Sequence, residues 1–150
     1  MKPLFILLQV FVISLIITAL TKGGLNIILS GRIALSVMLL FTAIGHFKFT
    51  RGMEMMMPQI VPAKRFLVYF TGVLEFVAAV GLFTNYQWIT GMCLLNFFVL
   101  VLPFNIYAAI HRVDYERATH EGKGPKYLWI RIPMQIFFIG WAYYFAVLHY

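Results

Sequence analysis

Charged residues are scarce in this chain, since Asp, Glu, Lys and Arg together make up only 11% of its 150 residues. Hydrophobic residues make up 62%, and the mean hydropathy is +0.87. A soluble domain of this length cannot bury so much apolar side chain, and the exposed remainder would aggregate in water. The composition therefore excludes a water-soluble domain and indicates that lipid is the solvent.

Cysteine is almost absent as well, and several catalytic motifs are missing. Cys93 stands alone, which excludes an intrachain disulfide, a CxxC redox pair and a cysteine-based zinc site. Because it falls within an apolar run, we expect Cys93 to be a small buried helix residue. The chain also lacks the phosphate-binding P-loop, G-x-S-x-G, H-E-x-x-H and the dinucleotide fingerprint. These absences favour a protein that is not an enzyme on its own.

Five apolar runs are each long enough to cross a bilayer as a helix. They lie at residues 4–20, 29–49, 66–84, 88–110 and 127–148. The first lacks the small-residue cleavage pattern of a signal peptide, so we expect it to be retained. The sequence predicts an all-α membrane protein with a single domain over residues 1–150. Within it, residues 29–150 form a four-helix transmembrane bundle, and residues 1–28 form an additional N-terminal transmembrane helix and loop.

Basic residues are distributed unevenly between the connections. If all five runs span and Lys2 is cytoplasmic, ten Lys and Arg residues lie on the cytoplasmic side and only Lys22 and Arg32 on the other. This positive-inside pattern predicts an integral protein of a bacterial cytoplasmic membrane, with its N-terminus in the cytoplasm and its C-terminus outside. The net charge of +7 then reflects contact with anionic lipid headgroups. We therefore expect membrane lipids, and no nucleic acid, as partners.

Five polar residues interrupt the apolar runs in the half of the membrane nearer the cytoplasm: His46, Glu75, Asn105, Arg131 and Gln135. At about 1.5 Å per residue, Glu75 and Gln135 lie roughly 12–14 Å from the inner helix ends. Asn105 and Arg131 lie about one turn from those ends, and His46 lies at the mouth. A charged side chain in the membrane costs several kcal/mol unless it is protonated, paired or hydrogen-bonded. If the five face inward, they form a polar funnel open toward the cytoplasm.

Two interpretations of this funnel remain open. In the structural one, Glu75 pairs with Arg131 or bonds Asn105 and Gln135, and the network fixes helix packing. In the functional one, the same groups bind a ligand or relay protons, with His46 able to change charge near neutral pH.

The connection at residues 50–65 is rich in methionine, with Met53, Met55, Met56 and Met57 close together. Thioethers can bind Cu(I), but no second cluster of soft ligands supports such a site, so no metal is expected. We expect an adaptable apolar segment at the headgroup level that can cover the funnel mouth.

Five short segments resemble the DoxX-like family of small membrane proteins. They are Gly45-His46-Phe47 and residues 57–62, 71–75, 102–107 and 131–135, with Phe104 where alanine is common in that family. The resemblance covers about residues 30–148. It implies a four-helix membrane bundle in which His46, Glu75, Asn105, Arg131 and Gln135 are the marked polar positions.

The resemblance also implies a range of functions. Members of the DoxX-like family include a thiosulfate:quinone oxidoreductase subunit and proteins of thiol and oxidative-stress handling, although the lone Cys93 does not suit thiol exchange. The leading hypothesis is an accessory subunit, or a binding protein for a small lipophilic ligand such as a quinone or lipid, linked to membrane redox processes. The alternative is a structural or assembly partner of another membrane protein, or a homo-oligomer, with no ligand. A small-solute or proton transporter comes third, because no inverted repeat is visible.

Overall fold

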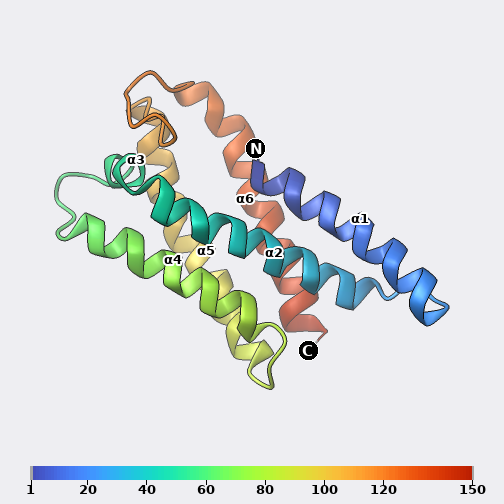
Figure 1. Cartoon of the computed structure of the whole chain (residues 1–150). Helices are drawn as coiled ribbons and strands as arrows, with labels where there is room; N and C mark the ends of the chain where they lie inside the picture. Colours follow the sequence, from blue (N-terminus) through green and yellow to red (C-terminus); the bar gives the residue numbers. More distant parts are fainter. Residues whose placement is uncertain (1, 150) are drawn as a thin grey trace.

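The structure is a computed structural model that describes residues 2–149. The described residues form helices and no β-strand. In chain order the helices are α1 (Lys2–Lys22), α2 (Ile27–Lys48), the short α3 (Thr50–Met55), α4 (Lys64–Gly81), α5 (Gln87–Ile110) and α6 (Leu128–Ala142) (Figure 1). A 3-10 turn at Pro125–Tyr127 precedes α6, and a π-helical segment at Tyr143–Leu148 continues it.

The predicted membrane bundle with an additional N-terminal helix is confirmed. Helices α1, α2 and α5 and the continuous segment Pro125–Leu148 are each long and apolar enough to cross a membrane. Helix α4 matches the third predicted run, but its 18 residues include Lys64, Arg65 and Glu75, and it is therefore more charged than the other four. It packs along α2, which also contacts α1 and α6, so α2 is the central helix.

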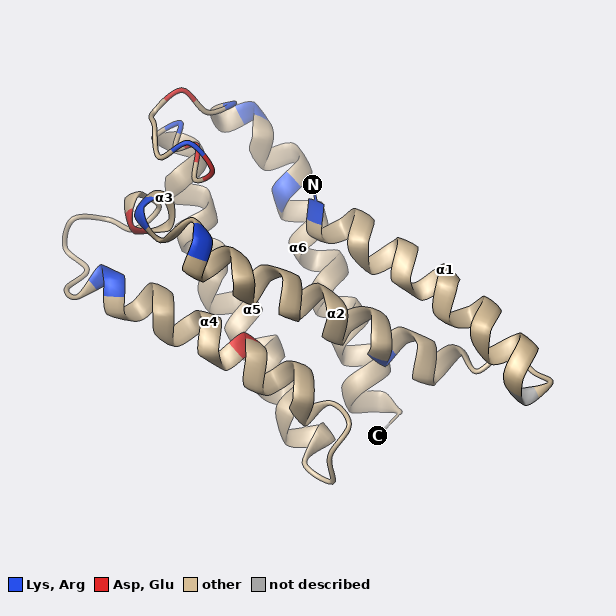
Figure 2. Cartoon of the chain, in the orientation of Figure 1, with Lys and Arg blue, Asp and Glu red and all other residues tan. Residues whose placement is uncertain are grey.

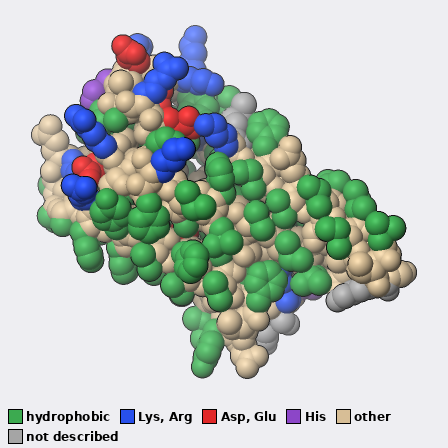
Figure 3. Space-filling view, viewed as in Figure 1, with side chains coloured by type: hydrophobic (Ala, Val, Ile, Leu, Met, Phe, Trp, Pro, Cys, Tyr) green, Lys and Arg blue, Asp and Glu red, His purple; other side chains and the backbone are tan. Residues whose placement is uncertain are grey.

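Charged side chains gather at one end of the bundle, around the α2–α4 and α5–α6 connections, whereas hydrophobic side chains cover the rest of the face shown (Figures 2 and 3). Lys2 lies at this end too, because its Nζ donates to both carboxylate oxygens of Glu116 at 2.8 Å. The start of α1 and the α5–α6 connection therefore lie on one side of the membrane, as predicted. That this side is cytoplasmic stays a prediction.

A stripe of small residues lets α4 approach α2 closely. Gly72, Glu75 and Ala79 are buried on one face of α4, as their spacing predicts. A Cβ added at Gly72 would lie 2.8 Å from the Cβ of His46, which is closer than side chains tolerate. One turn beyond Glu75, the Ser36 hydroxyl of α2 donates to the Ala79 carbonyl at 2.9 Å.

At the opposite end of the bundle, two polar side chains donate hydrogen bonds to backbone carbonyls of the segment that follows α6. The irregular end of α6 frees backbone carbonyls, which lipid cannot satisfy. Arg32 of α2 donates to the carbonyls of Phe145 and His149, and Gln87 of α5 donates to the carbonyl of Ala146 at 3.2 Å. From the sequence, Arg32 was expected only to be a basic residue on the non-cytoplasmic side of the membrane.

The methionine-rich connection contains a helix, α3, that the sequence analysis treated as loop. Gly52 of α3 packs directly against the backbone of Tyr115, leaving no room for a Cβ. The segment that follows is held by Lys64, whose Nζ donates to the Met57 carbonyl at 3.0 Å. Its tip is apolar and open, since Ile60 is 90% exposed.

Adding a methyl group at the α2–α4 contact should weaken the fold. In Gly72→Ala the new Cβ presses on His46, so we expect the free energy of unfolding in detergent to fall by about 1–3 kcal/mol. Gly140→Ala is the matched control, because nothing lies within 4 Å of a Cβ there and alanine favours a helix. Equal stability of the two variants would contradict the packing described.

The link between α1 and the α5–α6 connection should depend on pH. The hydrogen bond from Lys2 lowers the pKa of Glu116 below its ordinary value of 4.5. The stabilisation is therefore present above about pH 4.5 and is lost as the pH falls through the lower pKa of the folded state. At neutral pH we expect Glu116→Gln to cost at most about 1 kcal/mol, because the pair is largely exposed. Unfolding measured at about pH 2–3 should no longer separate the variant from the wild type.

Candidate functional site

A histidine and an acid meet where α2 crosses α4. Glu75 is only 6% exposed, and its Oε2 lies 3.5 Å from Nε2 of His46. This distance is longer than a charge-assisted hydrogen bond, which spans about 2.7–2.9 Å. Oε2 is buried and accepts no hydrogen bond from the described residues. The carboxyl group therefore has spare capacity to accept or share a proton.

The backbone of α4 fixes which nitrogen of His46 faces the acid. Nδ1 lies 3.1 Å from the carbonyl oxygen of Val68 and 3.1 Å from the hydroxyl of Thr71. A carbonyl can only accept, and the Thr71 hydroxyl itself donates to the carbonyls of Leu67 and Val68 at 2.9 Å. Nδ1 must therefore carry a proton, which leaves Nε2 as the variable nitrogen.

Nε2 of His46 and Oε2 of Glu75 face each other, so a single proton between the two side chains could reside on either atom. In one form an imidazolium faces a carboxylate, and in the other a neutral imidazole faces a carboxylic acid. Both forms are neutral overall, which suits a low-dielectric surrounding better than an unpaired charge. The pair can accept a proton from a bound molecule at Oε2, or donate one to it, while α4 keeps the imidazole oriented.

A narrow cavity of about 70 Å³ borders Glu75 between α4 and α5. Its other lining residues are apolar or weakly polar: Leu74, Ala78, Cys93, Leu94 and Phe97. Leu74 is 42% exposed and Cys93 is exposed, so the cavity opens toward lipid. The expectation that Cys93 is buried is wrong, because α4 packs on α2 and leaves this face of α5 largely uncovered.

Arg131 and Asn105 form a second group. Nη1 of Arg131 donates to Oδ1 of Asn105 at 3.1 Å, and the guanidinium lies 5.9 and 5.1 Å from the ring centres of Tyr115 and Tyr127. Burial, with a smaller contribution from the neighbouring Glu116, raises the pKa of Tyr115 to about 12, so its ring stays neutral. Aromatic faces and an amide contact this cation, and no carboxylate of residues 2–149 forms an ion pair with it.

Gln135 forms the third group. It is buried, and its Nε2 donates to the Phe98 carbonyl of α5 at 2.9 Å. Gln135, Phe138 and Ala142 share the buried face of α6, as their spacing predicts.

The five predicted residues therefore form three local groups. Among the described residues, no hydrogen bond or ion pair joins Glu75 to Arg131, Asn105 or Gln135. The reason is the packing: α4 lies against α2, whereas α6 lies against α5. Thr71, which orients His46, was not among the predicted site residues, because its spacing does not distinguish it from other helical threonines.

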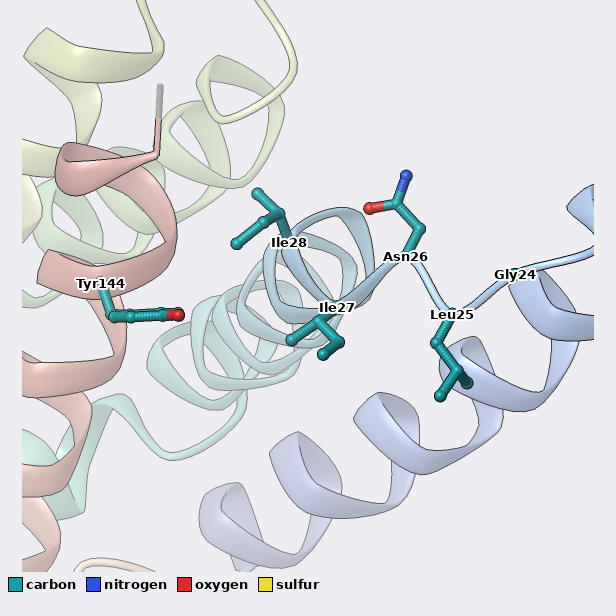
Figure 4. Close-up of a pocket in the computed structure, with 6 residues that line it drawn as sticks. All are labelled: Gly24, Leu25, Asn26, Ile27, Ile28 and Tyr144. Carbon is teal, nitrogen blue, oxygen red and sulfur yellow. The ribbon is translucent and has the colours of Figure 1, made fainter.

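A second, wider cavity of about 490 Å³ lies at the far end of α2. It is lined by Tyr144 and by five residues of the α1–α2 turn and the start of α2 (Figure 4): Gly24, Leu25, Asn26, Ile27 and Ile28. It contains none of the five predicted residues, and His46 lies at the opposite end of the same helix. Among residues 2–149, no three His, Cys, Asp or Glu side chains are grouped to hold a metal ion.

Double-mutant cycles can test the division into three groups. We expect His46→Ala and Glu75→Ala to be coupled by at least about 0.5 kcal/mol in the free energy of unfolding, because their side chains are in contact. Glu75→Ala and Arg131→Ala should be additive within about 0.3–0.5 kcal/mol. Strong coupling between Glu75 and Arg131 would instead support a single continuous network.

Comparison with known proteins gives one match. Residues 35–146, most of the chain, match the family model described as "Domain of unknown function (DUF8561)". The match includes all five predicted site residues and leaves α1 outside. No curated protein and no solved structure is significantly similar to the chain.

Proposed function

Since this chain belongs to the DUF8561 family, whose name carries no activity, we propose a function from the His46–Glu75 pair. The protein is an accessory membrane protein that binds a small lipophilic, quinone-like molecule beside Glu75. The pair exchanges protons with that molecule, and any electron transfer belongs to a partner protein. The likeness of five segments to the DoxX-like family supports this proposal.

The observation that carries the proposal is the unpartnered, buried Oε2 of Glu75 next to a cavity open to lipid. A hydroxyl group of a bound molecule can donate to this oxygen and so complete its hydrogen bonding. A molecule dissolved in the bilayer reaches the cavity between α4 and α5 without crossing water. The apolar lining suits a hydrocarbon body, and Glu75 supplies the polar contact that fixes orientation.

The cavity also limits how the ligand binds. Its volume of about 70 Å³ holds only the inner end of a molecule. A benzene ring occupies a cavity of roughly 150 Å³ in an engineered protein. A quinone ring therefore requires α4 and α5 to separate, and these two helices make few contacts with each other.

A second candidate function is a structural or assembly role without a ligand. It is favoured by the local satisfaction of Arg131, Asn105 and Gln135, each of which already has a partner within the chain. In that role the His46–Glu75 contact only fixes α2 against α4.

Removing the acid while keeping its shape distinguishes these functions. We expect wild-type protein to retain a short-chain ubiquinone analogue in native mass spectrometry, and Glu75→Gln to bind it at least about tenfold more weakly, which corresponds to about 1.4 kcal/mol. The ligand should also slow labelling of Cys93 by a maleimide, because Cys93 lines the cavity.

Glu121→Gln is the control, since it makes the same carboxyl-to-amide change in an exposed loop. Its affinity should match that of the wild type. If Glu75→Gln unfolds at the same temperature as the wild type, its weaker binding of the quinone analogue is not caused by a loss of folding. If the wild type retains no quinone and Glu75→Gln merely unfolds more easily, the structural role is correct.

A further inference from the structure

A stripe of exposed side chains runs along α5 on a side that faces away from the core. Its members are Ile89, Met92, Asn96, Val99 and Pro103, and all five are exposed. Their spacing alternates between three and four residues. This is the repeat that places side chains along the seam between two parallel helices.

Asn96 is the one residue of this stripe with a polar side chain. It is exposed, and its side chain bonds to Met92 of its own helix and not to Asn105. It lies roughly 14 Å along α5 from Gln87, near the middle of a hydrocarbon core of about 30 Å. Lipid tails offer no hydrogen bonds at this depth.

The amide of Asn96 is only partly satisfied. Its Nδ2 donates to the Met92 carbonyl at 2.9 Å, and within the described residues neither its second N–H nor its Oδ1 has a further hydrogen bond. Whatever covers the stripe must therefore offer both a donor and an acceptor at the same depth.

We propose that the stripe is the interface of a parallel homodimer, in which α5 of a second copy lies against it and the two Asn96 amides bond each other. An amide both donates and accepts, so it complements itself across a two-fold axis. Every copy has the same orientation in the membrane, which brings both Asn96 side chains to one depth. A single Asn within an otherwise apolar seam sets the register and favours two strands.

The dimer leaves the Glu75 cavity on the adjoining face of α5. Cys93 lies three residues before Asn96, at the edge between the seam and the cavity. This proposal does not depend on a ligand at Glu75.

Cross-linking in the membrane provides the first test. In a Cys93→Ala background, Val99→Cys places one thiol in the seam, whereas Val77→Cys places one on the lipid-facing side of α4. The two valines are matched, at 55% and 59% exposure. With copper phenanthroline and air as oxidant, we expect Val99→Cys to form a disulfide-linked dimer and Val77→Cys to stay monomeric.

The second test measures the contribution of Asn96. We expect Asn96→Leu to raise the dissociation constant of the dimer about 3- to 30-fold, as judged by energy transfer in liposomes of varied protein-to-lipid ratio. Unfolding of each monomer should be unchanged, because the side chain faces outward.

Three results would overturn the proposal. Equal cross-linking at both valines would indicate random collision. An unchanged dissociation constant in Asn96→Leu would show that the amides do not meet. A different membrane protein linked to Val99→Cys, with no linked dimer, would identify the seam as a heteromeric interface. If Asn96→Leu proves unstable, cross-linking at the two valines decides alone.

Discussion

The contact between His46 and Glu75 determines how closely α2 and α4 must pack. Lipid cannot solvate a carboxylate, so Glu75 requires a partner within the protein. That partner is supplied by α2, which can approach α4 closely because a Cβ at Gly72 would press on the side chain of His46. The close packing of α2 and α4 and the chemistry of the site therefore have the same cause.

The same requirement recurs at each polar group in the bundle. Arg131 is held by Asn105 and two tyrosine rings, and Gln135 is held by a carbonyl of α5. Arg32 and Gln87 donate to backbone carbonyls of the π-helical segment that follows α6. Each group is satisfied across one helix pair. Such pairwise satisfaction fixes neighbouring helices against each other, whereas Glu75 and Asn96 are described residues that keep unused hydrogen-bonding capacity.

Glu75 is a buried residue of α4, whereas Asn96 lies on the exposed face of α5, and we propose different roles for them. Glu75 is buried at the inner end of a cavity, where a small molecule can reach it from lipid. Asn96 projects from an exposed helix face, where a second helix can contact it. The difference in burial is the reason that the proposed ligand-binding role falls to Glu75 and the proposed association role to Asn96, although both residues are polar.

Much of the architecture could be predicted from the sequence, because hydropathy and charge act locally. Apolar runs of bilayer length defined the five long helices to within a few residues, and the distribution of basic residues placed Lys2 beside the α5–α6 connection. The buried faces of α4 and α6 followed from helical periodicity. The short α3 was missed, since six residues carry too little periodic signal.

The partners of the polar residues could not be predicted in this way. The sequence by itself determined that Glu75, His46, Asn105, Arg131 and Gln135 are membrane-embedded and must be satisfied, because that depends only on depth and charge. Only the tertiary structure decided that Glu75 meets His46, that Arg131 meets Asn105, and that Cys93 is open to lipid. Depth along a helix is fixed by residue number, whereas the neighbour at that depth is fixed by which helices pack together.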